Sequence, residues 1–223
     1  MGLLLNEDYF SRVNYDLFSV IPGGLSCVLE VGCGSGEMGL LYKAKYPKSR
    51  YFGIELDSNA AIRAESKIDA VLNVDVEDFD QYWNDFPLVD CLVYGDVLEH
   101  LRDPWNVLRQ HSLRLERSGV VVACIPNVQH WSVLATLMRG NWPVMDEGLF
   151  DRTHLRWFTK RGICELFSRS GFTITAMHAR VIAPEKCTEF SDAMKSSLEV
   201  LGIDMEEFSD GTFPFQYIVV ARK

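Results

Sequence analysis

Short β-rich runs alternate with helical patterns along most of this 223-residue chain, and this alternation constrains the fold more than any other feature. The β-rich runs lie at 27–31, 50–54, 70–74, 89–94, 119–125, 173–182 and 216–221, and the helical patterns lie at 37–46, 59–66, 104–115, 129–138 and 160–170. Strands that alternate with helices form a mostly parallel sheet joined by crossover helices. Residues 120–124 are continuously apolar, as expected of a strand buried on both faces. The sequence therefore predicts an α/β fold.

The size and composition predict one reduced, cytoplasmic domain covering residues 1–223. A net charge of −9 makes nucleic acids and anionic membrane surfaces improbable partners, and no apolar run approaches the roughly 18 residues that span a bilayer. The acidic N-terminal residues do not resemble a secretory signal. Six scattered cysteines without a C-x-x-C pair indicate neither a disulfide framework nor a zinc site, so no metal is expected.

Two segments interrupt the alternation and are interpreted as insertions into the domain. Residues 127–158 follow the fifth strand and are rich in Trp, His and Arg, which predicts a lid over the ligand site. Residues 184–212 hold eight acidic and two basic side chains, a net charge of −6. Charge runs of this kind are usually solvated, so we expect a surface helix and loop there.

The first strand runs into three alternating glycines, Gly32, Gly34 and Gly36, and a helix follows. Glycines at this position let the chain turn tightly and let a ligand approach the backbone. A nicotinamide-dependent oxidoreductase is one alternative, but its third glycine would fall at Glu37, where a carboxylate would meet the pyrophosphate. The loop therefore favours a neutral or cationic ligand.

Two carboxylates accompany the glycine loop. Glu55 ends the second strand at the spacing of a residue that accepts hydrogen bonds from ribose hydroxyls. Glu30 lies inside an apolar run, where burial without a partner is costly. A cationic ligand or backbone donors would stabilise it.

The segment 30–36 resembles motif I of class I S-adenosylmethionine-dependent methyltransferases, and the resemblance extends along most of the chain. It implies a Rossmann-like, seven-stranded, mostly parallel sheet with an antiparallel C-terminal strand and helices on both faces. It also implies S-adenosyl-L-methionine as cofactor. The family's ribose, adenine and methionine contacts match the ends of the second, third and fourth strands. The implied cofactor-binding residues are Glu30, Gly32, Gly34, Gly36, Glu55, Asp75, Val76 and Asp96.

Residues 125–132 and 151–159 are similar to a subgroup associated with bacterial polysaccharide, O-antigen and sugar modification. A sugar hydroxyl, free or nucleotide-linked, is therefore the expected acceptor. The predicted substrate-binding residues are Asn127, His130, Arg156 and Trp157. The family also carries an N-terminal helix over the cofactor, which residues 9–17 could supply.

His154 is the preferred catalytic residue, either as a general base or as a group that orients the acceptor, with Asp151 positioned to orient its ring. His100 is expected to have a packing or capping role. Five basic residues against three acidic ones between 139 and 161 suggest an acceptor with a carboxylate or phosphate. A non-catalytic protein that binds the cofactor or a partner is the remaining alternative.

Overall fold

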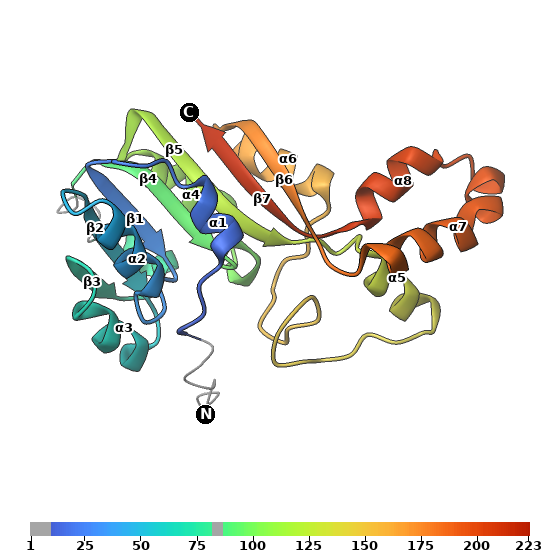
Figure 1. The fold of residues 1–223 in the computed structure, drawn as a ribbon, viewed down its shortest axis with the longest axis horizontal. Helices are drawn as coiled ribbons and strands as arrows, with labels where there is room; N and C mark the ends of the chain where they lie inside the picture. The colour runs from blue at the N-terminus through green and yellow to red at the C-terminus, as the bar shows by residue number, and fades with distance from the viewer. Residues whose placement is uncertain (1–9, 82–86) are drawn as a thin grey trace.

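The computed structural model describes residues 10–81 and 87–223, which form one seven-stranded sheet in the order β3-β2-β1-β4-β5-β7-β6. Strands β1 to β5 pair in parallel, and β7 is antiparallel to both β5 and β6, which confirms the predicted fold class (Figure 1). The strands are β1 (Cys27–Val31), β2 (Arg50–Glu55), β3 (Ala70–Asn73), β4 (Val89–Gly95), β5 (Leu115–Pro126), β6 (Thr173–Val181) and β7 (Pro214–Arg222).

Helices cover both faces of this sheet because successive strand residues point to opposite sides. Leu29, Leu92 and Val121 contribute to the core on one face, together with α4 (Pro104–Ser112) and α6 (Lys160–Arg169). Their neighbours Val28, Val93 and Val122 contribute to the core on the other face. That second core includes residues of α1 (Tyr15–Val20), α2 (Glu37–Lys45) and α3 (Ser58–Glu65).

The ends of several elements differ from the sequence prediction because local contacts set them. The predicted helix at 9–17 is instead α1, which begins after Asn14, whose side chain accepts a hydrogen bond from Leu17 N at 3.1 Å. Residue 9 lies outside the described residues. Helix α5 (Trp131–Met138) begins at 131 rather than 129 because His130 caps it. Strand β5 begins at Leu115, which pairs with Val89, and α4 correspondingly ends earlier than expected.

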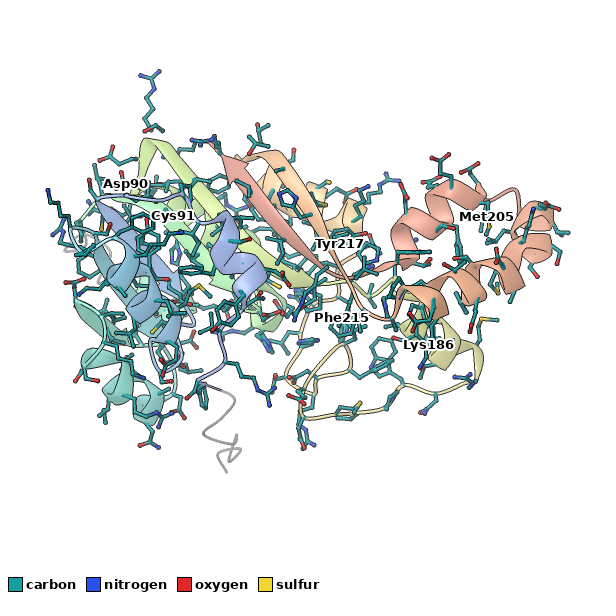
Figure 2. All side chains as sticks on the ribbon, viewed as in Figure 1. Asp90, Cys91, Lys186, Met205, Phe215 and Tyr217 are labelled. Atoms are coloured by element: carbon teal, nitrogen blue, oxygen red, sulfur yellow. The ribbon has the colours of Figure 1, made fainter. Side chains whose placement is uncertain are left out.

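The acidic segment 184–212 forms two helices, α7 (Pro184–Leu201) and α8 (Met205–Thr212), between β6 and β7. They project as an arm from the end of the sheet, and Lys186 and Met205 on this arm lie far from Asp90 and Cys91 of β4 (Figure 2). Phe190 of α7 contacts Trp131 of α5 with ring centroids 6.3 Å apart. Helix α7 of the arm therefore packs on α5, while α8 contacts β7, the strand that follows it.

Segment 127–158 is tied at its base by a parallel bridge between Asn127 and Phe158, where Val128 N donates to Phe158 O at 2.9 Å. Between these ends it holds α5 and an extended loop, drawn in olive and yellow below the sheet in Figure 1. No helix within residues 10–81 or 87–223 combines the length and apolar character that crossing a bilayer would require.

Candidate active site

A cavity of about 1060 Å³ lies beyond the carboxyl ends of β1, β2 and β4. The strand order reverses between β1 and β4, and ligands of open α/β sheets bind at such a reversal. One side of the cavity is formed by the glycine loop and the ends of these strands, and another by Met145, residues 147–151 and residues 153–154. The short 3₁₀ turn η3 (Leu98–His100) lies after β4 and contributes its last two residues.

The glycine loop adopts backbone conformations that side chains rarely tolerate. Gly32 and Gly34 have φ angles of 71° and 54°, and both line the cavity. A Cβ atom on Gly34 would lie 2.6 Å from Phe10 O, so the N-terminal segment already occupies the space beside this residue. Gly36 does not line the cavity, because a Cβ there would lie 3.1 Å from Ala64 of α3. The structure thus shows a packing contact for Gly36, and its contact with the cofactor stays a prediction.

Glu55 is buried at the end of β2 and holds the loop through two backbone donors. Its Oε2 accepts a hydrogen bond from Gly34 N and its Oε1 accepts one from Asp57 N, each at 2.8 Å. Burial raises the pKa of this carboxyl, while the two N–H donors oppose that shift. Glu55 lines the cavity, so its carboxylate is available to a ligand at the position expected for a ribose.

Glu30 is 4% exposed and lines the same cavity. The Tyr51 hydroxyl donates to its Oε2 at 2.9 Å, so the partner is a side chain rather than the backbone donors considered from the sequence. Burial raises the pKa of Glu30 to about 8, and the Tyr51 hydrogen bond only partly opposes the shift. A nearby cation would stabilise the ionised form.

Asp75, Val76 and Asp96 line the cavity after β3 and β4. Asp96 has a φ of 55°, an uncommon conformation for a residue other than glycine. Its Oδ1 accepts hydrogen bonds from Gln216 Nε2 of β7 and, at 3.4 Å, from Cys124 Sγ of β5. Burial raises the pKa of Asp96. Strained backbone held by surrounding contacts is common at functional sites, so this residue is a strong candidate for ligand contact.

His154 and Asp151 also line the cavity. They are distant in sequence from the glycine loop, and His154 lies beside η3 in space. His154 Nε2 lies 4.0 Å from Glu99 Oε1, and the His154 and His100 ring centroids are 4.8 Å apart. Burial, reinforced by His100, lowers the pKa of His154 to about 4, so its ring is neutral at pH 7. Asp151 Oδ1 accepts hydrogen bonds from Thr153 N and Oγ1, and Thr153 Oγ1 contacts His100 Nδ1 at 3.0 Å. Asp151 therefore supports the ring of His100.

The four predicted substrate-binding residues lie outside the cavity lining. Asn127 Nδ2 donates to Gly211 O and Pro214 O at 2.8 and 2.7 Å, which ties the arm to β5. His130 caps α5, and Arg156 donates to the Arg102 carbonyl. Trp157 is half exposed and contacts Trp142. Asn127, His130 and Arg156 are engaged in hydrogen bonds within segment 127–158 and its surroundings, and the Trp157 ring packs on that of Trp142.

Several lining residues were not predicted from the sequence. Glu99 and His100 follow Asp96 closely and enter the cavity from η3, whereas His100 was expected to pack or cap. Arg180 and Gln216 come from the C-terminal hairpin, with Arg180 Nη1 donating to Gln216 Oε1 at 2.6 Å. Their strands lie next to each other only through antiparallel pairing, and neither residue belongs to a local motif.

The basic residues counted from the sequence are largely engaged elsewhere. Arg152 pairs with Asp146 at 2.5 Å and Arg161 pairs with Glu165 at 3.1 Å. The described cavity lining instead carries nine carboxylate residues and two arginines, Arg12 and Arg180. Such a lining fits the cofactor implied by the resemblance, since its sulfonium and amino group are cationic while its ribose needs hydrogen-bond acceptors.

Comparison with known proteins agrees with this fit. The methyltransferase domain family matches residues 8–177. An S-adenosylmethionine-dependent methyltransferase from Archaeoglobus fulgidus has a similar structure, with a TM-score of 0.67, 18% identity, and coverage of 98% of this chain and 95% of that one. A second S-adenosylmethionine-dependent methyltransferase, from Mesorhizobium loti, gives a TM-score of 0.59, 19% identity and coverage of 94% and 96%.

A third similar structure is the plantazolicin methyltransferase BamL in complex with a triazolic desmethyl analogue and S-adenosylhomocysteine, with a TM-score of 0.61, 14% identity and coverage of 97% and 82%. No curated protein sequence matches the chain. Because the family match spans most of the sequence, the chain belongs to the methyltransferase domain family and is an S-adenosylmethionine-dependent methyltransferase.

Proposed function

We propose that this enzyme methylates a hydroxyl of a small polyhydroxylated acceptor, such as a sugar, in the half of the cavity beside His154. The observation that carries the proposal is the continuity of one cavity from the glycine loop to residues 145–154. Pockets for drug-sized ligands measure about 300–1,000 Å³. At about 1060 Å³, this cavity has room for a cofactor and a small acceptor side by side.

The chain's residues divide between the two ligands. Glu55 would accept hydrogen bonds from the ribose, and Asp75 and Val76 would contact the adenine at the end of β3. Glu30 and Asp96 would lie near the cationic methionine part, where their charge is favourable. The bound cofactor supplies an activated methyl group. Residues 127–158 would act as the lid, with the stretch 145–154 bordering the acceptor.

Methyl transfer needs the acceptor oxygen in line with the methyl carbon and the sulfur. The acceptor oxygen forms a bond to that carbon while the carbon–sulfur bond breaks and its electron pair stays on sulfur. The acceptor proton leaves to His154 or to water. Because the His154 ring is neutral at pH 7, it can accept a hydrogen bond from the hydroxyl in either case.

The charge of the lining favours a neutral acceptor group. The lining holds nine acidic residues and two arginines, and even with Glu30 protonated this negative excess would repel a phosphate placed deep in the cavity. A sugar ring offers hydroxyl donors to such carboxylates. In a nucleotide-linked sugar, the diphosphate would have to lie outside the cavity.

The test is transfer of a labelled methyl group from the cofactor to a panel of sugars, nucleotide sugars and small carboxylates. His154→Ala should lower turnover by about 10²–10⁴-fold if the ring is a base, and less, with a raised Michaelis constant, if it orients the acceptor. Cofactor affinity should stay close to wild type. His178→Ala, an exposed change on β6, is the matched control. Wild-type kinetics in His154→Ala would remove this residue from the acceptor site.

A further inference from the structure

The cavity contains a cluster of potential metal ligands that the cofactor does not require. Glu99, His100 and His154 each offer one ligand atom, and the three atoms lie within 4.8 Å of one another. We propose that this cluster binds a divalent first-row transition metal ion through two imidazoles and one carboxylate. The sequence analysis expected no metal, since it considered only cysteine motifs.

The Glu99 side chain gives an indication of a bound cation that does not depend on the distances within the cluster. Its side chain is 1% exposed, and neither carboxylate oxygen has a hydrogen-bond partner on another residue of the described chain. Buried carboxylates are normally hydrogen-bonded or paired with a cation, because burial of an unpaired charge is costly. The Asp96 and Asp151 carboxylates nearby increase the negative potential there. A divalent cation would relieve both the burial and the repulsion.

His100 is held as metal-ligating histidines usually are, by a hydrogen bond to a residue outside the cluster. Thr153 Oγ1 donates its proton to Asp151 at 2.6 Å, so the Nδ1 of His100, 3.0 Å away, must donate to Thr153. This fixes the tautomer of His100 and leaves a lone pair on Nε2. The ring of His154 lies edge-on to that of His100, with the two centroids 4.8 Å apart.

The backbone brings these residues together across 55 positions of sequence. Leu155 N and Arg156 N both donate to Glu99 O at 2.9 Å, so the residue after His154 is fixed against η3. In a tetrahedral zinc site the ligand atoms lie about 3.4 Å apart, as follows from bond lengths of about 2.1 Å. The side chains would therefore close inward by about an ångström when the ion binds.

Two imidazoles and one carboxylate suit Zn²⁺, Co²⁺, Mn²⁺ or Fe²⁺ better than Mg²⁺, which prefers oxygen ligands. Three protein ligands leave an open position, as in catalytic rather than structural sites. Since the cluster lines the cavity, that position faces the acceptor. The role of the ion rests on the proposed function: it would hold the acceptor hydroxyl and lower its pKa so that the proton leaves to water, while His154 would orient the acceptor through the ion instead of accepting the proton.

The test is a metal titration of the 223-residue chain, prepared without an affinity tag and treated with a chelator. Binding of Co²⁺ is followed by visible absorption, and binding of Zn²⁺ and Mg²⁺ is followed by calorimetry. We expect one equivalent of Co²⁺ or Zn²⁺ and much weaker binding of Mg²⁺. Glu99→Gln and His154→Ala should each weaken Co²⁺ binding by about tenfold or more, because even the outer hydrogen bonds of metal sites contribute that much. His178→Ala should bind as wild type does.

Circular dichroism and the affinity for S-adenosylhomocysteine identify any variant that fails to fold. If one of the two variants fails, His100→Asn is titrated with Co²⁺ in its place. Absence of saturable Co²⁺ and Zn²⁺ binding in the wild type would overturn the proposal. Binding that survives all three substitutions would do so as well, since the ion would then lie elsewhere. Failure to find a sugar acceptor would overturn only the proposed function, because the titration contains no acceptor.

Discussion

Substitution of Glu55 tests whether the cofactor's ribose binds at the end of β2. This carboxylate accepts hydrogen bonds from Gly34 N and Asp57 N, each at 2.8 Å. A hydrogen bond to a charged group contributes about 1.5–3 kcal/mol. Glu55→Ala should therefore lower the free energy of unfolding by about 3 kcal/mol, the lower end of the sum, because water can reach the half-buried Asp57.

Glu55→Ala should also lower the affinity for the cofactor. Unpaired ribose hydroxyls cost about 1–3 kcal/mol, which corresponds to an affinity loss of about 5- to 150-fold. Denaturant unfolding measures the change in the free energy of unfolding. Calorimetry with S-adenosylhomocysteine, at a temperature below the unfolding transition, measures the change in affinity. Glu55→Gln should resemble Glu55→Ala, because its amide group would turn a donor toward one of the two N–H groups.

Asp57→Ala is the matched control. Asp57 Oδ1 caps α3 by accepting from Ala60 N at 2.8 Å, so its loss should cost about 1 kcal/mol of stability while the Glu55 carboxylate is retained. Unchanged affinity in Glu55→Ala would refute the ribose assignment. An equal loss of affinity in Asp57→Ala would show that loosening of α3, rather than a lost contact, weakens binding.

Two further predictions concern Gly36 of the glycine loop and Glu30 of β1. Gly36→Ala should lower the free energy of unfolding by about 1–3 kcal/mol, since Gly36 has a φ of 80° and the added Cβ would lie 3.1 Å from Ala64. The control is Gly24→Ala, which should cost less stability because Gly24 has a φ of 71° but open space around a Cβ. Equal melting temperatures of the two variants would exclude the clash at Gly36. Burial raises the pKa of Glu30 from 4.5 to about 8, so the folded state holds a proton that the unfolded state has lost within that window. Relative to Glu30→Gln, the wild type should therefore lose about 1.4 kcal/mol of unfolding free energy per pH unit from about 4.5 to 8, and a constant difference across that window would contradict the buried ionisation.

The fold was predictable because its signals are local. Strands such as β4 and β5 are apolar on both faces, and the glycines after β1 mark the loop to α2. The ends of elements were less predictable. Asn14 and His130 start their helices through side-chain caps that depend on where the chain enters, and β5 is lengthened by pairing of Leu115 with Val89.

The candidate cofactor residues were predictable for a related reason. Parallel strands end at one edge of the sheet, so Gly32, Glu55 and Asp96 lie together although the sequence separates them. The close approach of Gly36 to Ala64 was not predictable, because Ala64 belongs to a helix whose packing no local pattern specifies.

Segment 127–158 shows why the acceptor side was harder to predict. Its composition suggested a ligand-binding lid, but composition does not determine which side chains point inward. Asn127 and Trp157 lie at the base, where the bridge between Asn127 and Phe158 closes the segment, and Asn127 is used to anchor the arm. The loop between them carries Met145, Leu149 and His154 into the cavity instead.

The position of Glu99 depends on this same loop, and it links the acceptor half of the cavity to the fold. Its carbonyl receives Leu155 N and Arg156 N, so a backbone contact holds His154 beside a carboxylate that is buried without a partner. A protein gains nothing in stability from such an arrangement in the absence of a ligand, because a well-packed apolar residue would avoid the cost of burying the carboxyl. The buried Glu99 carboxyl becomes favourable only when a cation or a hydrogen-bond donor enters the cavity. Both the acceptor hydroxyl of the proposed reaction and the proposed metal ion meet that requirement, and the Co²⁺ titration of Glu99→Gln separates them.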